Sequence, residues 1–272
     1  MAYQSQNQIA NIGSFKGAIN TPEMVKRMSS ACGGKEEGKQ FIASMLDLYE
    51  NDKYLQNCDP RLVIAECLKA ASLNLPLVKS LGYAYVVPYK NVPTFIIGYK
   101  GLIQLALRSG QYRRLNADCI YEGEEISFDR LSGAIKINGE RISDTAVGYF
   151  AYFELINGFE KTFYMTVEQI RAYGKKYSKA YSNGPWQTDF DSMAKKTVIR
   201  QILKYGPMST QMQRAEQFET QSAELAARAE ITSNANTVAM PDPTVVIDSE
   251  TGEVMDAPPV ITDDPTTPPM DF

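Results

Sequence analysis

The stretch YAYVVPYKNVPTFIIGYKGLIQLALR, residues 83–108, decides how the middle of the chain folds. Two runs rich in aromatic and β-branched residues, 83–89 and 92–97, flank Lys90-Asn91, and this pattern predicts a β-hairpin. The apolar spacing of residues 99–108 then predicts a helix. This succession indicates an α+β fold.

The hairpin is expected at the edge of its sheet. Pro88 and Pro93 lie inside its two strands, and proline has no backbone N–H to donate to a neighbouring strand.

Two helices are expected on the N-terminal side of the hairpin. Residues 40–57 place apolar side chains at helical spacing. Asp59-Pro60 has the residue types of an N-cap and a first helical position, and the helix that it opens is expected to end near Leu73. Residues 1–20 are polar and rich in Gln and Asn, so we expect them to be frayed.

More strands are expected after the helix at 99–108. Short strands are predicted near residues 115–121, 125–129 and 133–137. The clearest hairpin pairs residues 147–155 with 159–165 around the dipeptide Asn157-Gly158, which is typical of a type I′ turn.

The remaining part of the chain is expected to be helical and then disordered. Thr166 begins a capping-box sequence that opens a helix. Residues 174–187 are predicted to be a basic, tyrosine-bearing loop, and residues 188–205 a helix. Residues 211–230 can form a further helix, and residues from 232 onward have too few apolar side chains to become ordered.

Charge is divided unevenly along the chain. The formal net charge is −4, which alone argues against a nucleic-acid partner. Residues 215–272, however, hold 12 acidic residues and one basic residue, so residues 1–214 carry a net charge of +7. A basic body with an acidic tail suggests an anionic partner for the body. The alternative for the tail is a solvating segment that has no partner.

The composition excludes several kinds of chemistry. The chain has no histidine, which removes Ser-His-Asp and Cys-His catalysis and all histidine metal sites. Its four cysteines form no Cys-x-x-Cys pair, so we expect reduced thiols and no zinc knuckle. There is neither a long apolar run nor an apolar N-terminal signal region, which predicts a cytosolic protein. No cofactor and no metal is expected.

Two motifs with known chemistry are present only in part. Residues 33–40, GGKEEGKQ, nearly match a phosphate-binding P-loop, but Gln40 replaces the hydroxyl residue and no strand precedes the loop. We therefore expect no ATP hydrolysis. A nuclease would need several carboxylates in one pocket. The acidic pairs available for that are Glu36/Glu37, Glu124/Glu125 and Asp189/Asp191.

The helix expected at 188–205 carries a row of cations. Lys196, Arg200 and Lys204 recur every four residues on one face, with Lys195 beside them. The wider segment 161–204, which also includes Lys161, holds nine basic and three acidic residues. Two interpretations of this face are open: it binds phosphates, or it is an ordinary solvated surface.

A second cationic cluster surrounds the helix at 99–108. Its members are Lys100, Arg108, Tyr112, Arg113 and Arg114. Cations that follow phosphates, together with aromatic rings that stack on bases, are typical of single-strand binders. For most of the nearby tyrosines the alternative, a place in the core, is favoured. Tyr112 lies next to two arginines and is a candidate for stacking. Trp186, the only tryptophan, either packs the start of the basic helix or stacks on a base.

These segments resemble the RecT family of phage single-strand annealing recombinases. The resemblance runs in colinear order through about residues 40–207 and is most specific from Leu81 to Tyr112. The sequences that carry it are LNLP (73–76), LGYAYVVPY (81–89), GYKGLIQLALRSGQY (98–112), residues 148–163 and MAKKTVIR (193–200).

The resemblance implies a function and a fold. Family members bind single-stranded DNA, anneal complementary strands without ATP, form rings or helical filaments and usually act with a partner exonuclease. The implied fold is a small curved antiparallel sheet packed with helices, with DNA in a basic groove. No bond is made or broken, so the protein is not expected to be an enzyme or to have catalytic residues.

The resemblance also assigns roles along the chain. Residues 1–39 would be a flexible or oligomerisation region, 40–207 the DNA-binding annealing core, 208–231 a possible helix and 232–272 a disordered acidic tail. The family's basic positions fall on Lys100, Arg108, Lys195, Lys196, Arg200 and Lys204. The partners expected are single-stranded DNA, the annealed duplex and further copies of the chain in the bacterial cytoplasm.

Three other functions remain open from the sequence. They are a passive single-stranded DNA-binding protein, a nuclease, and a phage structural protein whose basic face binds something else. The tail, which ends in Pro268-Pro269-Met270-Asp271-Phe272, resembles the C-terminal tip of bacterial single-strand binding proteins. It could therefore share a host partner with them, or gate DNA by folding back.

Overall fold

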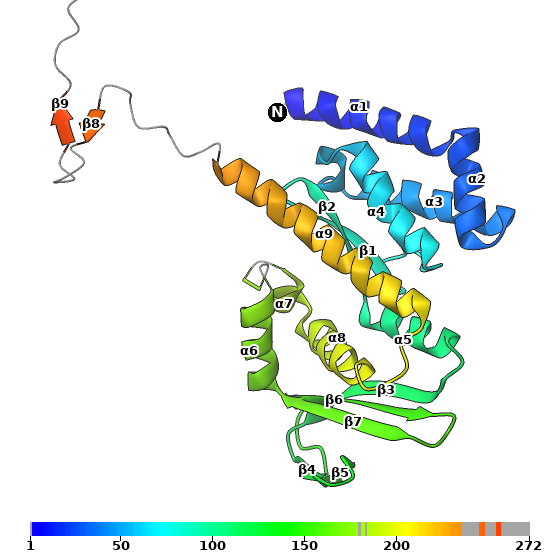
Figure 1. Cartoon of the computed structure of the whole chain (residues 1–272), viewed down its shortest axis with the longest axis vertical. Helices are drawn as coiled ribbons and strands as arrows, with labels where there is room; N and C mark the ends of the chain where they lie inside the picture. Colours follow the sequence, from blue (N-terminus) through cyan, green and yellow to red (C-terminus); the bar gives the residue numbers. More distant parts are fainter. Residues whose placement is uncertain (1, 179–180, 183, 236–244, 248–253, 257–272) are drawn as a thin grey trace, which may run out of the picture. The chain divides into compact units, whose positions relative to one another are not determined.

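The computed structural model describes residues 2–178, 181–182, 184–235, 245–247 and 254–256. The chain divides into two compact units, Met1–Arg228 and Ala229–Phe272. The first unit is α+β, as the sequence predicts: helices pack with small antiparallel sheets (Figure 1).

The N-terminal part of the first unit is helical from its beginning. Its elements are α1 (Ala2–Ile19), α2 (Pro22–Cys32), α3 (Lys35–Asn51), the short η1 (Leu55–Asn57) and α4 (Pro60–Ser72). The predicted N-cap Asp59 is confirmed, because its side chain accepts the N–H of Arg61 at 2.8 Å. The helix predicted at 40–57 begins earlier and is split into α3 and η1.

The expectation that residues 1–20 are frayed is wrong. Phe15 and Ile19 of α1 are fully buried, and the ring of Phe15 stacks on that of Tyr49 in α3 with a centroid separation of 4.0 Å. The polar composition of α1 concealed a narrow apolar face that packs on α3 and α4.

The hairpin expected at 83–97 is confirmed as β1 (Ala84–Tyr89) and β2 (Val92–Ile97), followed by α5 (Tyr99–Arg108). Lys90 and Asn91 have positive φ angles of 46° and 64°, as a type I′ turn requires. The hairpin forms a two-stranded sheet of its own, so both strands are edges, and Pro88 faces Pro93 across the ladder.

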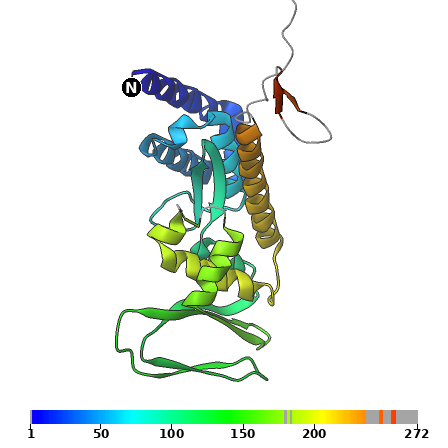
Figure 2. The ribbon, with the colours of Figure 1, turned by 90° about the vertical axis from the view of Figure 1, so that its left-hand side faces the viewer.

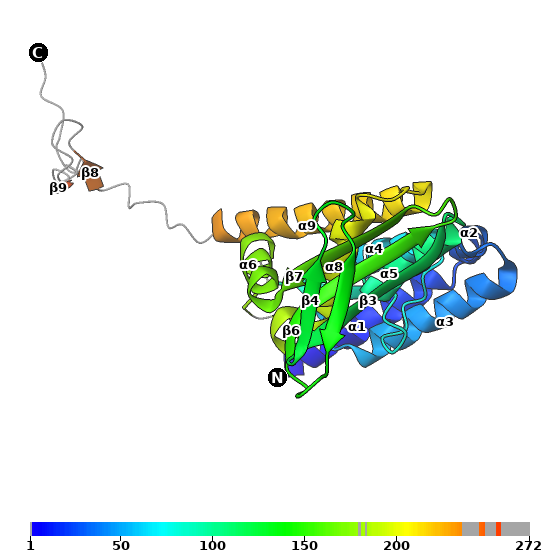
Figure 3. The ribbon, with the colours of Figure 1, turned by 90° about the horizontal axis from the view of Figure 1, so that it is seen from below.

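The second sheet has the order β3-β6-β7 and is antiparallel. Its strands are β3 (Tyr112–Tyr121), β6 (Ala146–Leu155) and β7 (Glu160–Thr166), and a separate hairpin consists of β4 (Glu124–Phe128) and β5 (Ile135–Gly139). Figure 2 shows helices on one side of this sheet and the β4–β5 hairpin on the other, and Figure 3 shows the strands from below.

The turn between β6 and β7 differs from the predicted type I′ turn. Of its two expected central residues, only Gly158 has a positive φ, 84°. The N–H of Leu155 bonds to the carbonyl of Phe159 at 2.8 Å, and that of Gly158 bonds to Leu155 at 3.0 Å. The connection is therefore a three-residue loop with glycine in the left-handed position.

The helices on the sheet are α6 (Val167–Tyr177), α7 (Pro185–Thr188) and α8 (Phe190–Leu203). The capping box at Thr166 is confirmed. Much of the loop predicted at 174–187 is helical, because α6 continues to Tyr177 and α7 begins at Pro185. The helix predicted at 188–205 begins after Asp189, which is its N-cap.

The helix predicted at 211–230 is present as α9 (Thr210–Ala235), whose residues up to Arg228 belong to the first unit. In the second unit, β8 (Val245–Ile247) pairs antiparallel with β9 (Val254–Asp256). Most of the tail for which disorder was expected, residues 232–272, lies outside the described residues.

The docking of α1 gives a test by stability. We expect Phe15→Ala to lower the free energy of unfolding by about 3–5 kcal/mol, because it removes a fully buried ring and leaves a cavity. Urea unfolding measures this. Tyr54→Ala is the control, since Tyr54 is 75% exposed and its loss should have little effect. Equal, small effects in both variants would mean that α1 does not pack as described.

Candidate nucleic-acid interface

The cations of α8 lie on two different sides of the helix: Lys195 faces β3, and Lys196 and Arg200 face α9. On the first side, the Nζ of Lys195 lies 2.9 Å from Oδ1 of Asp118 on β3. Partial burial lowers the pKa of Lys195, but the hydrogen bond and the charge of Asp118 outweigh this effect and raise the pKa above its usual value. Lys195 is therefore protonated and positively charged at neutral pH, and it lies at the edge of the sheet.

Two tyrosines lie near Lys195, and a second lysine, Lys100, lies near one of them, Tyr85, where both side chains approach Gly82. The helices α5 and α8 pack against each other, and the electrostatic influence of Tyr99 on Lys195 places the start of α5 near this ammonium. Burial, followed by the charges of Asp189 and Tyr99, raises the pKa of Tyr85, which places β1 there as well. Lys100, the next residue of α5, is exposed, and no ion pair joins it to another described residue. We call Tyr85, Tyr99, Lys100 and Lys195 the α5–α8 face.

The other side of α8 faces α9. Lys196 is buried, and its Nζ lies 2.7 Å from Oε1 of Glu219. Arg200 reaches the other oxygen of the same carboxylate at 3.1 Å. Burial lowers the pKa of Lys196, and the charge of Glu219 opposes that shift.

The expectation that this row of cations is available to a phosphate is therefore wrong for Lys196. Lys196 lies inside the protein, and Arg200 is shared with α9. Lys204 is exposed and bonds to the side chain of Gln201 at 3.0 Å. Sequence periodicity correctly placed Lys196 and Arg200 on one side of α8, but α9 covers that side. Lys204 follows the last residue of the helix as its C-cap.

The arginines of the second predicted cluster have partners within the fold. Arg108 donates to the carbonyls of Leu73 and Asn74, both at 2.9 Å, and thereby closes the end of α4. Arg113 and Arg114 both pair with Glu154 of β6, at 2.8 and 3.6 Å. These arginines are exposed, but they are not grouped with Lys195 by any contact within the described residues.

Two of the aromatic residues that were predicted to contact DNA, Tyr112 and Trp186, lie in the core. Tyr112 is 5% exposed, donates its hydroxyl to the carbonyl of Pro207 and packs edge-on against Phe153. Burial raises its pKa to about 12. Trp186 is also 5% exposed and lies between Tyr181 and Phe190. Stacking on a base is wrong for both rings as they are placed here, because neither has a free face at the surface.

Lys161 of β7 is half-buried, and its ammonium lies 5.1 Å from the ring centroid of Tyr205. This contact keeps its charge near the end of α8, apart from the α5–α8 face.

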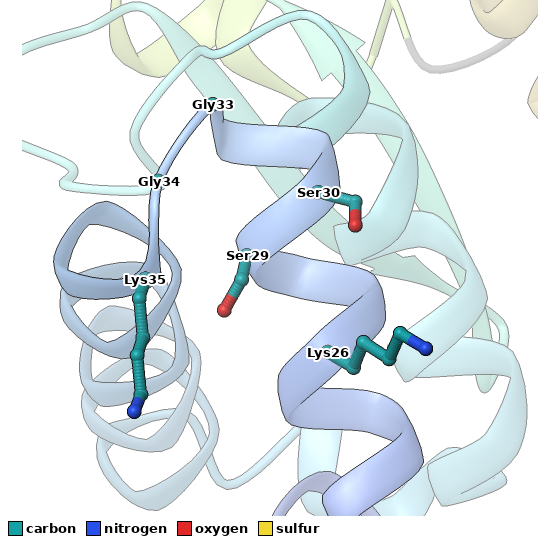
Figure 4. Close-up of a pocket in the computed structure, with 6 residues that line it drawn as sticks. All are labelled: Lys26, Ser29, Ser30, Gly33, Gly34 and Lys35. Carbon is teal, nitrogen blue, oxygen red and sulfur yellow. The ribbon is translucent and has the colours of Figure 1, made fainter.

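The segment that resembles a P-loop forms no phosphate cradle. It joins two helices, α2 and α3, and a shallow hollow beside it is lined by Lys26, Ser29, Ser30, Gly33, Gly34 and Lys35 (Figure 4). The two lysine side chains extend in different directions. The carboxylate of Glu37 lies where a side chain at Gly34 would be, at the start of α3. An anion would meet that carboxylate rather than free backbone N–H groups.

Within the described part of the chain, no helix has the length and apolar character needed to cross a membrane. Among those same residues, no three His, Cys, Asp or Glu side chains gather in a way that could hold a metal ion.

Two residues of this region were missed from the sequence. Asp118 lies on a strand 77 positions from Lys195, and Glu219 lies 23 positions from Lys196 and 122 from Ile97. No local pattern marks such partners, since only the fold brings them together.

Comparisons with known proteins agree with the sequence motifs. A family model described as the RecT family matches residues 39–232. An uncharacterised protein of Bacillus subtilis, YqaK, is 44% identical over 238 residues, which cover 87% of this chain and 79% of that protein. Protein RecT of Escherichia coli is 34% identical over 208 residues, which cover 72% of this chain and 77% of that protein.

The two neighbouring lysines of α8 should differ sharply in their effect on stability. We expect Lys196→Met to cost about 3 kcal/mol, because it leaves Glu219, whose side chain is only 12% exposed, with one cation fewer. Lys195→Met should cost less than about 1 kcal/mol, since its partner Asp118 is exposed. Urea unfolding of both variants measures the difference, and equal losses would contradict the two-sided arrangement.

Proposed function

Because the chain belongs to the RecT family, whose members are DNA recombination and annealing proteins, we propose that it binds single-stranded DNA and anneals complementary strands. In this proposal it needs no nucleotide hydrolysis and acts as a homo-oligomer, either a ring or a filament. It performs no bond chemistry of its own.

The α5–α8 face is the single observation that best supports DNA binding. It combines two ammonium groups, on Lys100 and Lys195, with the partly exposed rings of Tyr85 and Tyr99. Cations along a backbone and aromatic rings beside them form the combination that binds single strands without reading their sequence. Lys195 is exposed enough, at 22% of its side chain, to add a phosphate to its existing partner.

Asp118 limits the side from which a phosphate can approach Lys195. Its carboxylate is 54% exposed and lies against Lys195. A phosphate repels it, so the DNA backbone is expected on the side of Lys195 that faces away from β3. The same carboxylate holds the ammonium of Lys195 through a 2.9 Å hydrogen bond.

Annealing follows from contacts of this kind if they stop at the backbone. Ammonium groups hold phosphates and leave the Watson–Crick edges open. A second strand then tests its register by base pairing, which supplies all the sequence specificity. Copies of the protein side by side would keep successive segments aligned. The wider setting implied by the family, a bacterial cytoplasm with a partner exonuclease and a host single-strand binding protein, belongs to the same proposal.

Sequential mixing of two complementary oligonucleotides tests the function. Annealing is followed by fluorescence energy transfer, without nucleotide or magnesium. We expect the wild type to accelerate pairing well above the protein-free rate. Binding without acceleration would identify a passive single-strand binder, and shortened strands in a magnesium-containing sample would identify a nuclease; either result would overturn the proposal.

The double variant Lys100→Gln/Lys195→Gln tests the site. If each lysine neutralises one phosphate, the slope of log K against log salt should become less steep by about 1.4, from about 0.7 for each contact. The matched control is Lys26→Gln/Lys35→Gln, which removes the same charge from the exposed surface at α2 and α3. An equal change in the control would show a general charge effect and remove the α5–α8 face as the site.

A further inference from the structure

The C-terminal half of α6 carries cations and tyrosines that the α5–α8 face does not use. Residues 171–177, RAYGKKY, hold three cations and no carboxylate. Tyr177 is 63% exposed, which is high for a large ring. The rings of Tyr173 and Tyr177 lie one helical turn apart, with centroids 4.6 Å from each other.

The ammonium groups at this end of α6 lie beside rings rather than carboxylates. The Nζ of Lys176 is 5.2 Å from the centroid of Tyr177, and that of Lys175 is 6.0 Å from the centroid of Tyr181. No ion pair joins either lysine to a carboxylate within the described residues. A base that stacks on Tyr177 would therefore bring its phosphate close to an uncompensated cation.

This end of α6 is also held firmly in place. Ile170 and Gly174 are its buried residues. At Gly174 a side chain would meet Tyr181 and Trp186 at 2.9 and 3.0 Å, so only glycine allows this close packing. Arg171 lies over the ring of Phe190, the first residue of α8, at 4.6 Å. Tyr173 and the exposed Tyr177 are thus fixed relative to the helix that carries Lys195.

We infer that Tyr177, together with Tyr173, Lys175 and Lys176, forms a second contact surface on which unpaired bases of single-stranded DNA stack. This inference rests on the proposed function and extends it. A stacked base is available only in a single strand, because the bases of a duplex already stack on one another. The surface therefore favours strands that have not yet paired over the annealed product.

The first test compares single and double strands. Fluorescence anisotropy with a labelled oligothymidine and with a duplex of equal length gives both affinities. We expect Tyr177→Ala to weaken single-strand binding at least about fivefold, the lower end of the effect of losing one base–aromatic stack. Duplex binding and the salt slope should stay unchanged, and Tyr177→Trp should retain full affinity.

The matched control is Tyr54→Ala, which removes an exposed tyrosine, 75% exposed, from another part of the chain. Single-strand affinity within twofold of the wild type for Tyr177→Ala would overturn the inference. An equal loss on the duplex, or an equal loss with Tyr54→Ala, would also overturn it.

The lysines have a separate readout. Cations in the last turn of a helix also stabilise it through the helix dipole, without any ligand. If Lys175 and Lys176 contact phosphates, Lys175→Gln/Lys176→Gln should reduce the salt slope for single strands by about 1.4. An unchanged slope would assign them to the dipole alone and contradict the phosphate part of the inference.

The two proposals fail in different ways. If the wild type neither binds nor anneals single strands, the proposed function is wrong. If the wild type anneals and Tyr177→Ala binds single strands normally, the function stands and this second surface is wrong.

Discussion

Two carboxylates hold the first unit together at the free edge of the β1–β2 hairpin. Oε2 of Glu66 in α4 accepts the N–H of Phe95 at 2.9 Å, and Oε1 of Glu219 in α9 accepts that of Ile97 at 2.8 Å. On an edge strand, the N–H groups of alternate residues point outward. On β2 these residues are Pro93, Phe95 and Ile97, and Pro93 has no N–H to offer. The edge is thus satisfied by side chains where another strand would otherwise be required.

Each of these carboxylates is itself balanced by cations and hydroxyls. Glu66 accepts from Lys69 at 2.7 Å and from Ser222 of α9 at 2.6 Å, while Glu219 accepts from Lys196 and Arg200. A buried carboxylate without such donors would cost several kcal/mol. The arrangement fixes α9 against α4, β2 and α8, and it determines which cations of α8 remain available. Lys196 is committed to the fold, and Lys195, its neighbour in the sequence, faces the other way.

Local patterns predicted most of the elements but not their partners. The β1–β2 hairpin and α4 follow from β-branched runs and from Asp59-Pro60, signals contained within a few residues. The docking of α1 depends on Phe15 meeting Tyr49, a contact between distant segments that composition does not reveal. The same holds for the candidate site, where some features follow from the sequence and others only from the fold. Spacing identified the cations of α8, yet only the position of α9 decides that Lys196 is buried, and Tyr112 is a core residue because Pro207 and Phe153 surround it.

The facing pair Pro88 and Pro93 affects how neighbouring copies of the chain can associate through the β1–β2 hairpin. Open strand edges are templates on which identical chains can add to one another. Near its tip the β1–β2 hairpin has no donor on either outer edge, and farther along β2 the donors are occupied by Glu66 and Glu219. A neighbouring copy of the chain therefore finds no free donor among Pro93, Phe95 and Ile97 on the outer edge of β2. Strand addition by backbone hydrogen bonds is thus blocked along this edge, and contacts between copies at β2 have to use side chains.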